Sequence, residues 1–154
     1  MAFFRKQLRF QIDEKKSQDS LLTFILTKGN SKLGDALVNF IYSLAKSAVS
    51  TQVTGTKVSD FILATAYRSS LWMNNDIIKL KGKKGYLADH VEALILYFWV
   101  FEFITLEEMV KHLIKDLKPE KLNHPREEEQ IAVLSFKNLL NELKQKFIES
   151  KDAS

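Results

Sequence analysis

Residues 31–44 read Ser-Lys-Leu-Gly-Asp-Ala-Leu-Val-Asn-Phe-Ile-Tyr-Ser-Leu, and they combine a helical repeat of apolar residues with one acidic side chain. Leu33, Leu37 and Phe40 are three or four residues apart, which predicts an amphipathic helix packed against a core. Asp35 lies among these apolar residues. A buried aspartate is costly unless it is paired with a cation or bound to a metal. We therefore expect this helix to carry a functional carboxylate.

A second stretch, Leu-Ala-Asp-His-Val-Glu-Ala-Leu-Ile at residues 87–95, places two acids in a similar apolar setting. Asp89 and Glu92 are three residues apart, so both side chains project from one face of a helix. With Asp35 they form a set of carboxylates of the kind that Mg²⁺ prefers. The alternative interpretation is that each acid is an ordinary helix cap or ion-pair partner.

The chain of 154 residues contains only 5 Gly and 2 Pro, which favours long helices over a many-turned β fold. We expect one all-α domain, in which Lys28-Gly29-Asn30 ends one helix and Ser31 caps the next. Residues 1–12 form either a strand-like arm or a short helix. Six helices are expected in the rest of the chain, over about 20–27, 31–50, 59–73, 86–103, 105–117 and 125–149.

Several classes of chemistry are excluded by what the sequence lacks. The chain has 0 Cys, which rules out a disulfide scaffold, a zinc ribbon and a thiol nucleophile, and which fits a reducing compartment. It contains no Walker A loop and no Gly-x-Ser-x-Gly elbow, so we expect no nucleotide cofactor. The most apolar run, residues 93–101, is shorter than the ~20 residues that a membrane span needs. We expect a cytoplasmic protein with no membrane partner.

The net charge of +4 is compatible with a polyanionic partner but does not require one. Basic residues flank both acidic stretches and are candidate phosphate contacts. The alternatives are a solvated lysine loop before residue 87 and ion pairs with nearby acids beside Asp35. These candidate residues are Lys28, Lys32, Lys79, Lys81, Lys83 and Lys84.

Aromatic residues crowd the end of the second acidic helix, and they invite two interpretations. They are either a base-stacking surface or a buried core, and the second is favoured because they cover all sides of one helix. In a small domain, part of that burial could come from a second subunit. The cluster consists of Tyr97, Phe98, Trp99, Phe101 and Phe103.

Both acidic stretches resemble motifs of the ribonuclease III family. Residues 32–40 are similar to its signature helix, which has the core Leu-Gly-Asp-Ala-Val-Leu, and residues 87–95 are similar to its second motif, Ala-Asp-x-x-Glu-Ala-Leu-Ile. Between them, Lys57-Val58-Ser59 and the helix that follows resemble the family's Lys-Val-Ser-Asn segment. The resemblance covers residues 20–104. The helices over 105–149 match nothing beyond helical packing, and no double-stranded RNA-binding domain is expected.

The resemblance implies an all-α, homodimeric endonuclease that cleaves double-stranded RNA with Mg²⁺ or Mn²⁺ and leaves 5′-phosphate and 3′-hydroxyl ends. Asp35, Asp89 and Glu92 then become catalytic metal ligands. Ser31 departs from the family, because it replaces a glutamate one helical turn before Asp35. A serine brings no negative charge, although it can hold a metal-bound water. Lys28 likewise replaces an acidic residue of many members.

Three hypotheses follow for the function. The first is a metal-dependent endoribonuclease acting on double-stranded or structured RNA, which retention of three acids favours. The second is a catalytically weakened RNA-binding or assembly protein of the same fold, which Ser31 favours. The third is a helical interaction module in which the acids are purely structural.

Overall fold

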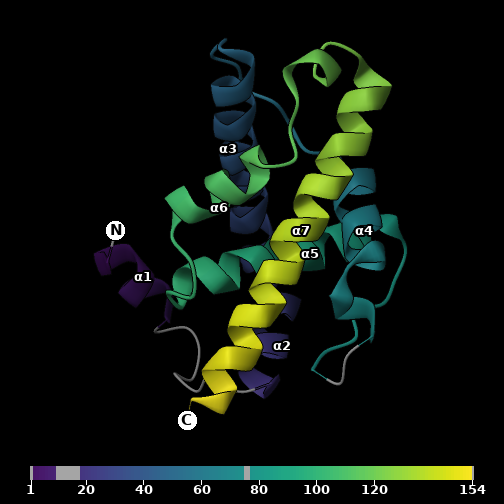
Figure 1. The fold of residues 1–154 in the computed structure, drawn as a ribbon. Coiled ribbons are helices and arrows are strands. Elements are labelled where there is room, and N and C mark those ends of the chain that lie inside the picture. Colours follow the sequence, from purple (N-terminus) through teal and green to yellow (C-terminus); the bar gives the residue numbers. More distant parts are fainter. Residues whose placement is uncertain (1, 10–17, 75–76, 154) are drawn as a thin grey trace.

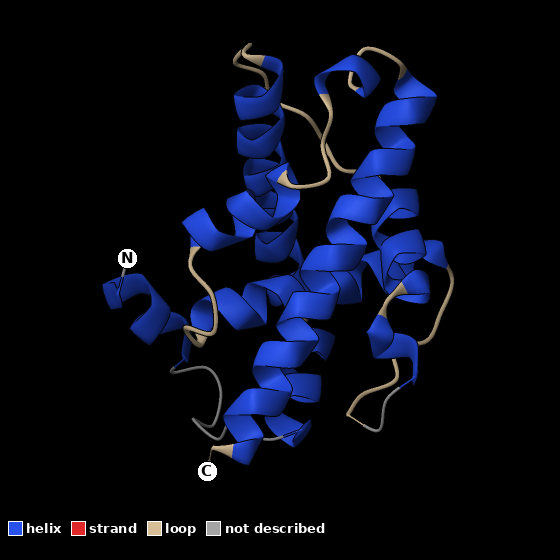
Figure 2. Ribbon diagram, in the orientation of Figure 1, coloured by secondary structure: helices blue, strands red, loops and turns tan. Residues whose placement is uncertain are grey.

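The computed structural model describes residues 2–9, 18–74 and 77–153, and this part of the chain is all-α, without a strand (Figure 2). The all-α prediction is confirmed, and the expected arm begins as a helix; its residues 10–12 lie outside the described part. The α-helices are α1 (Ala2–Arg9), α2 (Gln18–Leu26), α3 (Lys28–Ser50), α4 (Asp60–Ser69), α5 (Lys84–Val100), α6 (Leu106–Ile114) and α7 (Pro125–Asp152), with short 3-10 helices η1 (Leu71–Asn74) and η2 (Pro119–Lys121).

Helix α5 forms the centre of the molecule. Every residue from Val91 to Val100 is buried, and α2, α3 and α4 make the largest contacts with this helix. Figure 1 shows α5 running behind the long helix α7, with α3 and α4 to either side. The aromatic residues at its end lie in this core, where Tyr97 packs against Phe24 of α2 with ring centroids 5.5 Å apart. Helices of the same chain supply the burial, so α5 needs no second subunit to cover it.

Helix α5 ends at Val100, three residues before the predicted end. Glu102 adopts the left-handed conformation with φ 63°, and the amides of Glu102 and Phe103 donate to the carbonyls of Trp99 and Phe98 at 3.2 and 2.9 Å. This is a Schellman motif, usually built on glycine. The Arg9 guanidinium of α1 donates two further hydrogen bonds to the Val100 carbonyl, at 3.0 and 2.7 Å. Apolar residues continue in the sequence beyond Val100, so the apolar pattern did not reveal where α5 ends.

Helix α3 begins at Lys28, one turn earlier than predicted. Only Thr27 separates it from α2, so Lys28-Gly29-Asn30 forms the first turn of α3 rather than a stop. Ser31 is therefore not a cap. Its hydroxyl donates to the Lys28 carbonyl at 2.8 Å, inside the helix. The glycine misled the prediction, because an exposed Gly29 is tolerated in a first turn at modest cost.

Gly34 lies where α3 crosses α5. A Cβ atom at this position would overlap the backbone carbonyl of Glu92 and would lie 3.1 Å from the amide nitrogen of Ala93. Backbone atoms cannot move aside as the end of a flexible side chain can. Glycine is therefore required for the two helices to approach this closely. The approach brings Asp35, the next residue of α3, beside the part of α5 that carries Glu92.

Substitution of Gly34 by Ala should lower the free energy of unfolding by about 1–3 kcal/mol, because the new methyl group forces α3 away from α5. Gly29→Ala is the matched control, since a Cβ there meets nothing within 4 Å. It should leave stability unchanged or raise it by up to about 1 kcal/mol through helix propensity. Urea denaturation followed by circular dichroism measures both. Equal stability of the two variants would disprove the close approach.

Candidate functional site

Four acidic side chains line one cavity of about 260 Å³ between α3, α4 and α5. Asp35 comes from α3, Asp60 from the first residue of α4, and Asp89 and Glu92 from α5. The rest of the lining is Ser31 and three lysines, Lys28, Lys32 and Lys57. The cavity therefore combines a carboxylate cluster with cationic side chains, which is a suitable arrangement for a divalent cation and a phosphate together.

The Asp35 carboxylate is held by its own helix. Its Oδ1 accepts a hydrogen bond from the Asn39 amide nitrogen at 3.1 Å, one turn further along α3. The Asn39 oxygen in turn accepts from the backbone amide of Val58 at 2.7 Å, in the segment that enters α4. Asn39 thus couples the orientation of Asp35 to the position of the segment that carries Lys57.

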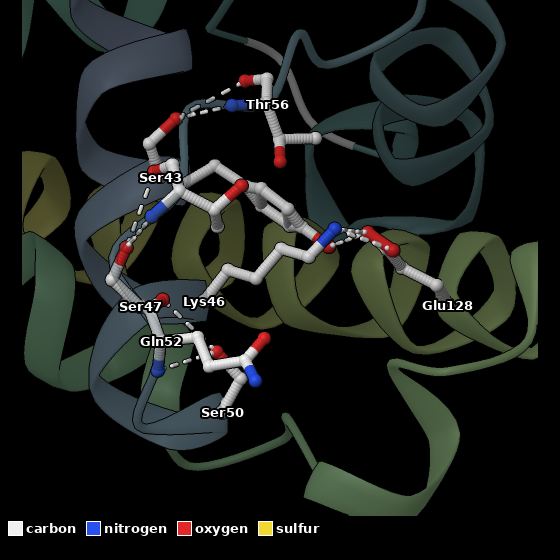
Figure 3. A network of polar contacts seen from close by, with 9 residues as sticks. Ser43, Lys46, Ser47, Ser50, Gln52, Thr56 and Glu128 are labelled. Carbon is white, nitrogen blue, oxygen red and sulfur yellow. Dashed lines mark hydrogen bonds and ion pairs between the residues drawn. The ribbon is translucent and has the colours of Figure 1, made fainter.

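Two serines extend this attachment along α3, as Figure 3 shows. The Ser43 hydroxyl accepts from the Thr56 amide at 2.8 Å and donates to the Thr56 carbonyl at 3.2 Å. Ser47 makes the same pair of bonds with Thr54, at 2.9 and 3.2 Å. The polar stripe Asn39, Ser43 and Ser47 therefore fixes residues 54–58 against α3 and sets where α4 begins.

Helix α7 is attached to the other side of α3. The Lys46 ammonium lies 2.8 Å from both carboxylate oxygens of Glu128 (Figure 3), and the Tyr42 hydroxyl donates to the same carboxylate at 3.0 Å. Burial, and then the neighbouring Glu128 charge, raise the pKa of Tyr42. The hydroxyl consequently remains a donor. Glu128 is thus engaged in an ion pair that holds α7 and is not part of the acidic cavity.

Glu92 is the buried member of the cluster, with 5% of its surface exposed. No hydrogen bond or ion pair within the described residues engages its carboxylate. Burial, and then the charges of the neighbouring Asp35, Asp89 and Asp60, raise its pKa to about 8, whereas Lys57 opposes them. A carboxyl group in this environment is protonated near neutral pH.

The residues present fit a hydrated magnesium ion better than a closed protein cage. Within the described part of the chain, no three His, Asp or Glu side chains already lie close enough together to hold a metal ion. Mg²⁺ usually keeps several waters and contacts only one or two carboxylates directly. The unpartnered Glu92 carboxylate, with three further acids around the same cavity, offers ligands of that type.

The structure brings together most of the predicted site residues, but not the lysines that lead into α5. Asp35, Asp89 and Glu92 share the cavity with Ser31, and Lys28 and Lys32 also line it. The other four predicted lysines are exposed and do not contribute to its lining. They lie on the approach to α5 and in its first turn: Lys79, Lys81, Lys83 and Lys84.

Sequence reasoning missed Lys57 and Asp60. Both belong to the segment that resembles the family's Lys-Val-Ser-Asn, where Asp60 stands in the place of the asparagine. An acid at a position where an amide is expected was the available signal. The signal was weak, because an acid directly after Ser59, the residue that caps α4, is also explained by the helix dipole.

Comparison with known proteins gives one family. The family model described as ribonuclease III matches residues 28–149, which run from the first residue of α3 almost to the end of α7. The matched range includes every residue that lines the acidic cavity. No curated protein matches the chain.

Glu92 should make the stability of the metal-free protein depend on pH. Its pKa in the folded state is about 8 against an ordinary value of 4.5, so between these values the folded chain binds a proton that the unfolded chain releases. The stability that this bound proton contributes to the folded state is fully present below about pH 4.5 and is lost as pH rises through about 8. At 1.36 kcal/mol per unit of pKa, the loss has an upper bound of about 5 kcal/mol.

The measurement is urea unfolding in excess chelator at several pH values between these limits. Glu92→Gln cannot ionise, so it should lack this loss and should become more stable than the wild type at alkaline pH. Glu107→Gln, an exposed change on α6, should follow the wild type. The same pH dependence in all three proteins would refute an elevated pKa at Glu92.

Proposed function

The chain belongs to the ribonuclease III family, and from this premise we propose that it is a metal-dependent endoribonuclease that cleaves double-stranded or structured RNA. The observation that carries the proposal is the buried, unpartnered carboxylate of Glu92, which shares one cavity with Asp35 and Asp89. A structural ion pair would have supplied this carboxylate with a cationic partner. Burial of its charged form without such a partner is costly unless a cation binds.

Asp35, Asp89 and Glu92 are proposed to hold Mg²⁺ or Mn²⁺, and Ser31 to contact a coordinated water. When bound, such a cation activates water and offsets the charge that develops on the phosphate. Glu92 would hold such a cation as a carboxylate, so binding would displace the proton that burial and the neighbouring acids favour on this group. Attack of water on the phosphodiester then breaks the bond to the 3′ oxygen and leaves a 5′-phosphate and a 3′-hydroxyl.

The lysines of the cavity are proposed to contact the RNA backbone. Lys28, Lys32 and Lys57 line the same cavity as the acids, within reach of a phosphate at the cation. The exposed lysines that precede and begin α5 would extend the contact along the duplex. A-form RNA offers phosphates and 2′-hydroxyls rather than base edges, so we expect little sequence specificity. A cytoplasmic location, as predicted from the sequence, suits this substrate.

A second copy of this chain is the proposed partner at an apolar groove beside the acidic cavity. The groove has a volume of about 610 Å³ between α3 and the segment that follows it. Phe40 in its lining is 53% exposed, and Val53 is fully exposed. Lys57 lines both the groove and the acidic cavity. Apolar side chains exposed together in this way favour a dimer interface, and the family resemblance implies a homodimer.

Glu92→Gln should lower Mg²⁺-dependent cleavage of a long RNA duplex by at least about a hundredfold, because it removes a charged ligand of the proposed cation, and the cation offsets the charge of the transition state. The assay compares the wild type, this variant and Glu107→Gln with Mg²⁺ and with Mn²⁺. Wild-type rates for Glu92→Gln would rule out this site. A wild type that binds the duplex but does not cleave it would instead establish the RNA-binding or assembly function that Ser31 favours.

Phe40→Ser should weaken self-association at least about tenfold, because it removes an aromatic contact from the proposed interface. Analytical ultracentrifugation over a range of protein concentrations measures the dissociation constant. Leu134→Ser is the matched control, since Leu134 is also exposed but lies on α7 outside the groove. A monomeric wild type, or equal effects of both variants, would contradict this interface.

A further inference from the structure

We propose that Asp60 supplies the fourth carboxylate of the cation site, from the start of α4, and so compensates for the serine at position 31. The inference rests on the metal site proposed above and assigns an additional acidic residue to it. It arises from the placement of Asp60 in the fold.

The Asp60 carboxylate faces the first turn of α5. Its Oδ2 atom lies 3.8 Å from the point where a Cβ of Gly85 would stand, which is the distance of an ordinary van der Waals contact. Ser59 caps α4 by accepting a hydrogen bond from the Ile62 amide at 3.3 Å. Asp60 is not needed for that cap, and its side chain lines the acidic cavity together with Asp35, Asp89 and Glu92.

The Asp60 carboxylate is available to a cation. Within the described residues, no hydrogen bond or ion pair engages it, although Lys57 lines the same cavity. Glu92 on α5 is a second carboxylate without a hydrogen-bond or ion-pair partner, and only 5% of its surface is exposed. A deeply buried acid without an ion-pair partner beside an accessible acid favours the binding of a cation in the cavity.

Ser31 cannot supply the fourth carboxylate of the cation site. Its surface is 9% exposed, and its hydroxyl already donates to the Lys28 carbonyl at 2.8 Å. The family resemblance places a glutamate at position 31 and an asparagine at position 60, whereas this chain has serine and aspartate. The cavity therefore keeps four carboxylates, but the fourth comes from α4 instead of α3. The negative charge that attracts a divalent cation is preserved by this exchange.

A titration with Mn²⁺ alone tests the inference. The affinity is measured by isothermal titration calorimetry and by the electron paramagnetic resonance signal of free Mn²⁺. Asp60→Asn should weaken Mn²⁺ binding about tenfold to a hundredfold, the range for loss of a group that supports a metal directly or through water. Ser31→Glu combined with Asp60→Asn should recover most of the affinity. Asp152→Asn, the same change in the exposed last residue of α7, should bind as the wild type does.

A purely structural role gives a different result. An acid in the first turn of α4 interacts favourably with the helix dipole, and its loss would lower the free energy of unfolding equally with and without Mn²⁺. Wild-type affinity in Asp60→Asn would therefore overturn the inference while leaving the proposed function intact, provided that Glu92→Gln abolishes binding. Absence of Mn²⁺ binding in the wild type would overturn both. Circular dichroism verifies folding, and Asp60→Ser repeats the test if Asp60→Asn does not fold.

Discussion

At Gly34 the backbone of α3 lies against the backbone of α5 with no space for a side chain between them. The position of the candidate site depends on this contact. Asp35 follows Gly34 directly, and the carbonyl that faces Gly34 belongs to Glu92, so one close approach places two carboxylates from different helices at one cavity. The cost of bringing these acids together is electrostatic, and packing of the buried helix α5 offsets it.

The position of α4, the third wall of the cavity, depends on two polar repeats of similar length, one on α3 and one in residues 54–58. Asn39, Ser43 and Ser47 recur every four residues on α3, which advances about 6 Å per step. They bind Val58, Thr56 and Thr54, which recur every two residues in an extended chain that advances about 6.6 Å per step. Because the two steps nearly agree, the extended segment runs along the helix, and α4 starts with Asp60 at the cavity.

Local patterns were sufficient to predict the elements and the three acids from α3 and α5. The three-residue spacing of Asp89 and Glu92 correctly places both acids on one face of α5. The apolar repeat of α3 gave the wrong core face, because Leu33 and Phe40 are exposed, whereas Gly34, Val38 and Ile41 are buried. Several helix ends were misplaced. The end at Glu102 depends on Arg9 from a distant helix, and the start at Lys28 includes a glycine. The helices predicted to end at about 73 and 117 end at Ser69 and Ile114. Asp60 was missed for a related reason. Its place in the cavity follows from the contacts of Asn39 and the serines with residues 54–58, and no local pattern of α4 encodes them.

The most direct test of whether the approach of α3 to α5 builds a cation site is a crystal structure of the protein soaked in Mn²⁺, with the ion located by its anomalous scattering. We expect one Mn²⁺ in the cavity between α3, α4 and α5, coordinated by Glu92 and at least one of Asp35 and Asp89, with water in its remaining positions. An empty cavity under conditions in which Mn²⁺ occupies other acidic surfaces of the same molecule would contradict this assignment.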